Sequence, residues 1–213
     1  MIYQETECGV LYLGDCLDIL PTLADKSVDL VLTDPPYGIC YDYASYDDTL
    51  ENTKQLINSM LIEAKRIATT TAMFIGVGTM YEFGKPDWTM VWFSPSRPNL
   101  CPYGFSTWTP IHIYGKDKRK NNGALPDGFE TSRLTIHQNE HTCVKPIEPV
   151  AWLVKRFTDK NQLVCDPFAG SGTTAIACIQ TKRRYILIEK EEKYCEIAAK
   201  RIETYLDQTE IEL

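Results

Sequence analysis

The chain has 213 residues, 44% of them hydrophobic, and its 22 basic and 29 acidic side chains give a net charge of −7. A chain of this length is expected to form one domain, residues 1–213, whose core is large enough to fold without disulfides or a structural metal. The acidic balance argues against binding nucleic acid through general positive charge, and 24% charged with 11% aromatic residues exclude a disordered chain.

Targeting and redox signals are absent from the sequence. No apolar run approaches the roughly 18 residues that a membrane span requires, and the first residues show no basic segment followed by an apolar core. The eight cysteines form no C-x-x-C pair. We therefore expect a cytoplasmic protein with reduced thiols, no metal site and no membrane partner.

Short β-rich runs alternate with amphipathic runs along the chain. The predicted strands are 10–13, 28–33, 72–77, 89–93, 110–114, 163–166 and 185–189. The predicted helices are 50–68, 147–157, 173–180 and 191–206. This alternation favours a Rossmann-like α/β fold with a doubly wound, mostly parallel sheet. The runs 89–93 and 110–114 have no helix between them, which predicts an antiparallel pair at one edge.

Two stretches are predicted to be long loops, Ser94–Ser106 with three prolines and Lys116–Glu140 with Asn-Asn-Gly and Pro-Asp-Gly turn signals. Long loops inside a domain are often functional, so we expect a short target-recognition insertion at about 94–140. Residues 116–145 carry a net charge of +2, against −9 for the rest. A basic cluster there is either a solvated face or a phosphate contact, and its members are Lys116, Lys118, Arg119 and Lys120.

The first chemical motif is Asp34-Pro35-Pro36-Tyr37-Gly38, which follows an apolar strand. Two prolines cannot continue a strand or enter a helix interior, so the chain must leave the sheet rigidly. This puts a carboxylate, a proline carbonyl and an aromatic ring at the carboxyl end of a buried strand, where ligands bind in open α/β sheets. The alternative is a turn capped by Asp34 beside a packing tyrosine. The tyrosine-rich loop after it, Gly38–Asp48, is either a lid or an ordinary polar loop.

The second motif is Asp166-Pro-Phe-Ala-Gly-Ser-Gly-Thr-Thr174, between a strand and a helix. Glycines at this position let the backbone approach a ligand closely. Glu189 ends the next predicted strand, where a carboxylate can accept both hydroxyls of a ribose. If the two motifs end adjacent strands, a nucleoside cofactor lies beside Asp34 and Tyr37. That arrangement suits recognition of a planar base with an amino group.

At these residues the sequence resembles the S-adenosylmethionine-dependent DNA amino-methyltransferases, which methylate N6 of adenine or N4 of cytosine. Asp34–Tyr37 is similar to the catalytic D-P-P-Y of this family, and Asp166–Thr174 to its cofactor loop. The segments Gly14–Leu20, His141–Pro146 and Arg184–Glu189 resemble its G-D-x-x-D-x-L, H-P-T-x-K-P and R-x-x-G-I-E. The catalytic motif comes first, as in the permuted beta group.

The resemblance implies a class I methyltransferase fold, with a seven-stranded sheet and one antiparallel edge hairpin. It implies that Asp15 accepts from the cofactor's adenine amine, that Glu189 holds the ribose and that Lys145 lies near the methionine end. Thr142 and Cys143 stand where the family has Pro and Thr. The implied catalytic residues are Asp34, Pro35, Pro36 and Tyr37. The implied cofactor-binding residues are Asp15, Cys16, Asp34, Lys145, Asp166, Phe168, Ala169, Gly170, Ser171, Gly172, Thr173 and Glu189.

The implied reaction moves a methyl group from S-adenosylmethionine directly to the exocyclic amine of a base flipped out of DNA. Unstacking the base costs a few kcal/mol, and stacking on Tyr37 recovers roughly 1–3 kcal/mol. Asp34 and the Pro35 carbonyl accept from the amine, and no cysteine nucleophile is needed. We expect DNA as the partner and leave a homodimer open.

Several alternatives stay open at this point. The D-P-P-Y motif is used with both bases but leans toward adenine, so N6 of adenine is the first choice and N4 of cytosine the second. An NAD-dependent oxidoreductase could use Gly170–Ala175 and Glu189 but leaves Asp34 and Asp15 without a role. A non-catalytic DNA-binding subunit, or an enzyme that methylates RNA or a protein glutamine, shares the fold.

Overall fold

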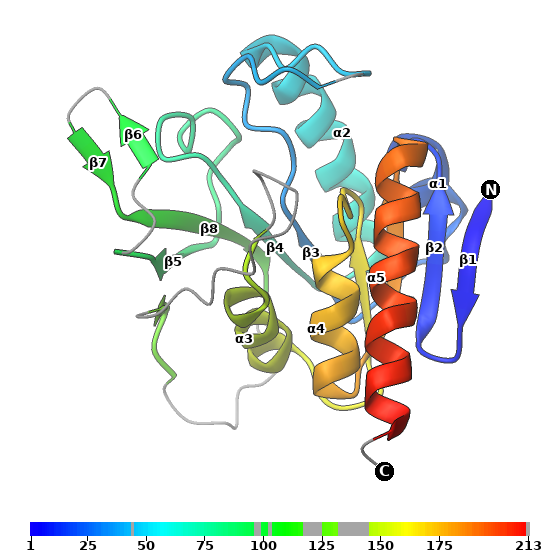
Figure 1. Ribbon diagram of the computed structural model, residues 1–213. Coiled ribbons are helices and arrows are strands. Elements are labelled where there is room, and N and C mark those ends of the chain that lie inside the picture. The colour runs from blue at the N-terminus through cyan, green and yellow to red at the C-terminus, as the bar shows by residue number, and fades with distance from the viewer. Residues whose placement is uncertain (44, 96–98, 102–103, 117–124, 132–144, 212–213) are drawn as a thin grey trace.

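A computed structural model of the protein describes residues 1–43, 45–95, 99–101, 104–116, 125–131 and 145–211. Within these residues one large sheet has nine strands, in the order β1-β2-β11-β10-β3-β4-β8-β5-β9. Its centre is parallel and consists of β2 (Gly9–Leu13), β11 (Arg184–Glu189), β10 (Leu163–Asp166), β3 (Leu30–Thr33) and β4 (Thr70–Phe74). The predicted doubly wound, mostly parallel architecture is confirmed (Figure 1).

Both ends of the sheet are extended by shorter or antiparallel strands. On one side β1 (Ile2–Thr6) pairs antiparallel with β2. On the other, β8 (Trp108–Gly115) and β5 (Trp88–Phe93) run antiparallel, as predicted, and β9 (Gly128–Glu130) adds a parallel strand beyond β5. The expected count of seven strands is therefore wrong. The additional edge strands β1 and β9 are half-exposed or only three residues long, and such segments carry no clear hydrophobic period.

The segment 94–140 contains both strands and loops. β8 lies inside it and belongs to the large sheet, so the described part of any insertion is split in two. The predicted loop Ser94–Ser106 contains a separate antiparallel pair, β6 (Asn99–Cys101) and β7 (Gly104–Ser106). Each strand has three residues, which is too short to produce a periodic pattern.

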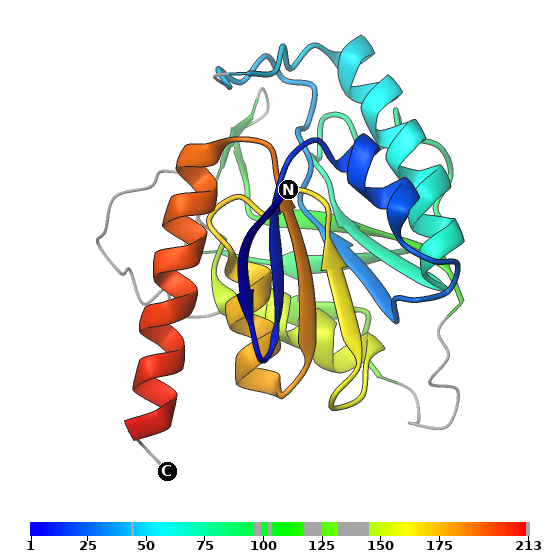
Figure 2. The same ribbon diagram turned by 90° about the vertical axis from the view of Figure 1, so that its right-hand side faces the viewer.

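Helices cover both faces of the sheet (Figure 2). One face carries α3 (Ile147–Phe157), α4 (Thr173–Thr181) and α5 (Glu192–Ile211), and the other carries α1 (Cys16–Ile19), the 3₁₀ turn η1 (Leu20–Thr22) and α2 (Leu50–Ile67). Along each strand, side chains belong alternately to the two cores, because successive side chains point to opposite faces of the sheet. Leu30 and Leu32 of β3 belong to the α3–α5 side, whereas Val31 between them belongs to the α2 side.

Burial on both faces explains why the central strands appear as continuous apolar runs. All four residues of β3 and all five of β4 are buried. The carboxyl ends of β2, β11, β10, β3 and β4 lie at one edge of the sheet, because these strands are parallel. This edge is the upper one in Figure 1 and receives the chemical motifs. Among the described residues, no helix is long and apolar enough to cross a membrane.

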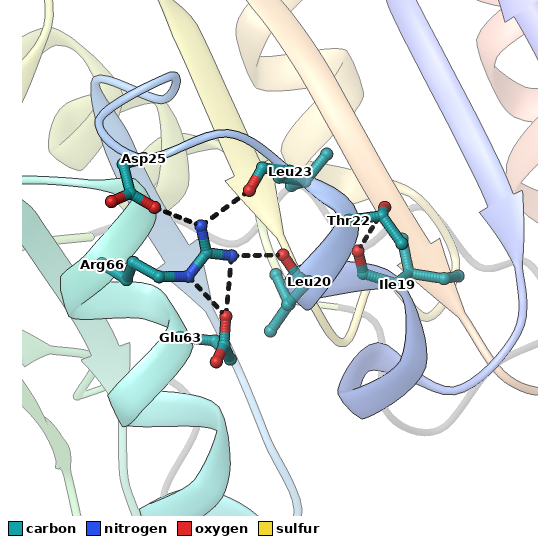
Figure 3. Close-up of polar contacts among 7 residues, drawn as sticks. All are labelled: Ile19, Leu20, Thr22, Leu23, Asp25, Glu63 and Arg66. Carbon is teal, nitrogen blue, oxygen red and sulfur yellow. Dashed lines mark hydrogen bonds and ion pairs between the residues drawn. The ribbon is translucent and has the colours of Figure 1, made fainter.

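Arg66 joins the end of α2 to the segment that follows α1 (Figure 3). Its guanidinium donates to the Leu20 carbonyl at 2.9 Å and the Leu23 carbonyl at 2.8 Å. It also pairs with Asp25 at 2.6 Å and with Glu63 at 2.7 Å. A planar group with five donors can satisfy such a set of divergent acceptors, which a lysine cannot. Arg66 thus fixes the chain between α1 and β3, upstream of the catalytic motif.

Replacing Arg66 by methionine is expected to lower the melting temperature, because two turn carbonyls and two carboxylates lose their donor. Arg184→Met, at an exposed arginine of β11, is the matched control and should leave the melting temperature near that of the wild type. Differential scanning calorimetry of the three proteins measures this. Equal melting temperatures for Arg66→Met and wild type would contradict the stabilising role.

Candidate active site

The two chemical motifs follow neighbouring strands. β3 and β10 pair in parallel, with Val31 opposite Cys165. Thr33, the last residue of β3, donates its hydroxyl to Asp166 Oδ1 at 2.7 Å. This hydrogen bond connects the residue before Asp34 with the first residue of the second motif, Asp166–Thr174, which we call the glycine loop. The prediction that both motifs end adjacent strands is confirmed.

The Asp166 carboxylate faces inward and is 4% exposed. Besides the Thr33 hydroxyl, it accepts from the Phe168 amide at 3.1 Å and from the Thr174 hydroxyl at 2.5 Å. Burial raises the pKa of Asp166 to about 6, although these hydrogen bonds favour the charged form. Its described contacts are internal, so we assign the side chain to bracing the loop. Direct contact with a cofactor stays a prediction for this residue.

Asp34 lies within a group of three polar side chains. Its Oδ1 accepts from the Tyr37 hydroxyl at 2.6 Å, and its Oδ2 pairs with Lys145 Nζ at 2.6 Å. Lys145 Nζ also donates to the Tyr37 hydroxyl at 3.1 Å and lies 4.5 Å from the centre of the Phe74 ring. Lys145 was predicted near the cofactor's methionine end. The structure places it on the Asp34 carboxylate, between the end of β3 and the start of α3.

The backbone around Tyr37 is held from a neighbouring turn. Thr79 donates its hydroxyl to the Tyr37 carbonyl at 2.9 Å. A Cβ built on Gly76 would lie 3.2 Å from Tyr37 Cδ2, so the ring packs against a residue without a side chain. Pro35 is buried, and Pro36 and Tyr37 are partly exposed. The aromatic face is therefore fixed in place while one part of it remains accessible.

The loop that follows the D-P-P-Y motif is held in place by Asp48, which is 2% exposed. Its carboxylate accepts from the amides of Gly38, Ile39 and Tyr41 at 2.8 to 3.1 Å, and from the Thr53 hydroxyl at 3.0 Å. Four hydrogen bonds on one buried carboxylate fix the start of the loop relative to α2. These contacts order the first residues of the loop, and the choice between a lid and an ordinary polar loop stays open. A hollow of about 410 Å³ lies over residues 40–43 and 46–48.

The glycine loop contacts the carboxylate of Glu189. The Gly170 amide donates to Glu189 Oε2 at 2.8 Å, and the Glu191 amide donates to Oε1 at 2.9 Å. Burial raises the pKa of Glu189, and the backbone amides act against that rise. Gly170 has a φ of +50° and open space where a Cβ would stand, and Gly172 has a φ of +79°. Non-glycine residues rarely adopt such φ values, so the loop can bring its backbone close to a ligand.

The other members of the loop are partly or fully enclosed. Ala169 and Thr173 are buried, and Phe168 is partly buried against the core on the α2 side. Ser171 is contacted by Arg201 of α5, whose guanidinium donates to the Ser171 hydroxyl at 2.7 Å. Arg201 lies in none of the sequence motifs.

Asp15 caps α1 next to Glu189. Its Oδ1 accepts from the Leu17 amide at 2.9 Å, and its Oδ2 pairs with Lys190 at 3.0 Å. Burial alone would raise the pKa of Asp15, but these two donors outweigh it and hold the pKa below its usual range. The Gly14 amide donates to the Glu189 carbonyl at 2.8 Å, which joins the two segments. Burial raises the pKa of the Cys16 thiol to about 12, so this thiol is not a nucleophile.

The predicted DNA-contacting cluster is only partly described. Lys116 is exposed, and its backbone is fixed by Thr69 and Thr70 next to β4. Lys118, Arg119 and Lys120 lie outside the described residues, as do Thr142 and Cys143. Their roles stay predictions.

Sequence reasoning missed the residues that support the motifs from a distance. They are Thr33, Asp48, Gly76, Thr79 and Arg201. Thr33 directly precedes Asp34 and could have been found there. Thr79 and Arg201 could not, because only the fold brings them to Tyr37 and Ser171.

Asp166 gives a pH-dependent prediction. Because its pKa is raised from the usual 3.8 to about 6, the folded state binds this proton more tightly than the unfolded chain, and stability is lost as pH rises from about 4 through 6. Asp166→Asn removes the titration. As pH rises from 4 to 7, the unfolding free energy of the variant should therefore increase relative to that of the wild type, by at most about 3 kcal/mol. Urea unfolding across this range measures it. Gln208→Ala, at an exposed and uncharged site of α5, is the control and should run parallel to wild type. A parallel course for Asp166→Asn would contradict the raised pKa.

Relatives with known folds share this architecture. The PvuII DNA methyltransferase (cytosine-N4-specific) superposes with a TM-score of 0.73 at 16% identity, covering 97% of this chain and 94% of that chain. The M1.HpyAVI–SAM complex gives a TM-score of 0.67 at 21% identity, covering 90% of this chain and 98% of that chain. The class I methyltransferase fold is thereby confirmed, with nine strands in the described part of this chain.

Sequence comparison agrees with the fold. The type II methyltransferase M.HinfI of Haemophilus influenzae is 24% identical over 89% of this chain and 67% of its own length. A family model described as DNA methylase, that of the N6 and N4 methyltransferases, matches residues 79–200. This match spans more than half of the sequence, and the chain belongs to the DNA methylase family of N6 and N4 amino-methyltransferases.

Proposed function

We propose that the protein transfers a methyl group from S-adenosylmethionine to the exocyclic amine of a DNA base, with N6 of adenine as the first choice of acceptor. The observation that carries this proposal is the hydrogen bond between Thr33 and Asp166. It holds the D-P-P-Y carboxylate and the glycine loop on adjacent strands, so an acceptor amine and a methyl donor can meet between them. N4 of cytosine is the alternative acceptor, favoured by the specificity in the name of the PvuII enzyme.

The residues at the sheet edge fit the cofactor. Open space beside Gly170 gives a ligand access to the loop backbone, and Glu189 supplies a fixed carboxylate beneath it. Asp15 offers a second carboxylate acceptor one strand away, where α1 begins. A ribose needs the first kind of group and an adenine amine the second. The loop 166–173, Glu189 and Asp15 with the Cys16 amide would hold the cofactor, which when bound supplies an electrophilic methyl group.

Asp34, the Pro35 carbonyl and Tyr37 would handle the acceptor base. The amine has two hydrogens, and the carboxylate and carbonyl are two acceptors for them. Holding both hydrogens directs the nitrogen lone pair, otherwise conjugated with the ring, out of the base plane. Asp34 can then receive the proton that the nitrogen loses as it is methylated. Positioning of this kind supplies a large part of the rate enhancement.

Lys145 and Tyr37 already donate to Asp34, so the amine must share or replace these donors. Lys145 thus borders the proposed acceptor site, and its position near the methionine end of the cofactor stays a prediction. The basic residues near 116–120 are the candidate phosphate contacts, and a flipped base agrees with the partly exposed face of Tyr37. Homodimer formation stays a prediction, which light scattering can measure.

The decisive assay uses labelled cofactor with DNA, followed by nucleoside analysis. Label in N6-methyladenine supports the first acceptor, and label in N4-methylcytosine supports the second. Methylation of RNA or of protein glutamine instead of DNA would contradict the substrate. A melting temperature raised by NAD and not by S-adenosylhomocysteine would favour the oxidoreductase alternative.

Asp34→Ala is expected to abolish methyl transfer while leaving S-adenosylhomocysteine affinity within a few-fold of wild type, because Asp34 would act on the acceptor amine. Asp207→Ala, at an exposed aspartate of α5, is the control. Single-turnover methylation and calorimetric binding measure the two properties. Near-normal methylation by Asp34→Ala would overturn the mechanism.

Two substitutions of Tyr37 distinguish the contribution of base stacking from that of hydrogen bonding. Tyr37→Phe keeps the ring and loses the hydroxyl, which donates to Asp34 at 2.6 Å and accepts from Lys145 at 3.1 Å, so we expect about a tenfold fall in kcat/KM. Tyr37→Ala also loses base stacking, worth roughly 1–3 kcal/mol, and should fall about 5- to 150-fold further. Steady-state methylation of both variants measures this difference. Equal activities of Phe and Ala variants would show that the ring does not stack on the base.

A further inference from the structure

Arg201 of α5 contacts the glycine loop from the side opposite to the catalytic motif. Its Nη1 donates to the Ser171 carbonyl at 2.5 Å and to the Ser171 hydroxyl at 2.7 Å, and lies 3.5 Å from the Thr173 hydroxyl. These contacts connect residues thirty positions apart in the chain. They engage both the main chain and the side chain at the middle of the loop.

The loop needs such support because two of its residues are glycines. Gly170 and Gly172 adopt positive φ, and glycine loses more conformational freedom on folding than any other residue. The Gly170 amide is held by Glu189 and the Ala169 amide by the Ile188 carbonyl. Ser171 lies between the glycines, and Arg201 holds both its carbonyl and its hydroxyl.

The same face of α5 approaches the loop at a second point. A Cβ built on Gly172 would lie 3.0 Å from the Cβ of Ala198. Ala198 and Arg201 are three residues apart and therefore neighbours on one helix face. The small residue lets the helix backbone come close, and the long residue reaches past it to Ser171.

Packing alone does not explain an arginine at this position, because burying its charge lowers stability. Arg201 is partly buried, and burial lowers its pKa. In the part of the chain that the structure describes, it forms no ion pair with a carboxylate. A partly desolvated charge without an ionic partner costs stability that a glutamine or methionine would not. What arginine supplies in return is a long side chain whose Nη1 reaches both the carbonyl and the hydroxyl of Ser171.

We propose that Arg201 is a positioning residue for the cofactor loop, holding Ser171 so that residues 170–172 keep the conformation that S-adenosylmethionine needs. This inference rests on the proposed cofactor site. Arg201 acts through Ser171 and touches no reacting atom. Its loss is therefore expected to weaken cofactor binding and to leave the methyl-transfer step nearly unchanged once the cofactor is saturating.

The test measures S-adenosylhomocysteine binding by calorimetry for wild type, Arg201→Gln and Arg201→Lys. We expect Arg201→Gln to raise Kd roughly 10- to 100-fold, the range for lost hydrogen bonds to a charged group, and Arg201→Lys to recover part of it. In methylation assays KM for the cofactor should rise in parallel while kcat stays within about twofold. Lys200→Gln, at the exposed neighbour on α5, should match wild type in both assays.

A double-mutant cycle with Ser171→Ala tests the route of the effect. Ser171→Ala removes one acceptor of Arg201 and should raise Kd in the wild-type background but not in Arg201→Gln. Wild-type affinity in Arg201→Gln, or an equal Ser171→Ala effect in both backgrounds, would overturn the proposal. If Arg201→Gln is unstable by calorimetric melting, the Arg201→Lys comparison decides by the same criteria. A wild-type protein that binds no S-adenosylhomocysteine would instead reject the proposed cofactor site.

Discussion

The pairing of β3 with β10 is the constraint on which the site depends. Both strands are almost completely buried, so their register is set by the two cores on either side of the sheet. A slip of one residue would exchange the faces of Leu30, Val31 and Leu32 and would also separate Thr33 from Asp166. Packing across the sheet therefore fixes a hydrogen bond at its edge. The position of Asp34 relative to the glycine loop follows from that bond.

The site concentrates carboxylates that are supported in different ways. Asp166 and Glu189 are held mainly by internal donors and have raised pKa values because of burial. Asp34 is partly exposed and paired with a lysine, and Asp15 is held by an amide and a lysine. The buried Asp166 is suited to bracing the loop, whereas the partly exposed Glu189, Asp34 and Asp15 are accessible to a ligand. Environment thus divides roles among residues of one chemical type.

Elements with a strong local signal could be predicted from sequence, and those defined by distant contacts could not. α3 and β10 have the predicted bounds, and α2 ends one residue before its predicted end, because their apolar patterns are regular. α5 extends five residues beyond its prediction, since its last turns carry little apolar pattern. The motifs located Asp34, Gly170 and Glu189. No local pattern indicated that Lys145 pairs with a residue 111 positions earlier.

The buried carboxylate of Asp48 bears on the affinity for a nucleobase in the proposed mechanism. A segment that becomes ordered only upon encounter loses its conformational entropy at that moment, and affinity falls accordingly. Because Asp48 gathers the amides of Gly38, Ile39 and Tyr41 in the folded protein, that entropy is already lost during folding. The backbone that follows Tyr37 is thus preorganised, and in the proposed mechanism more of the stacking free energy would remain available to offset the unstacking of the DNA base.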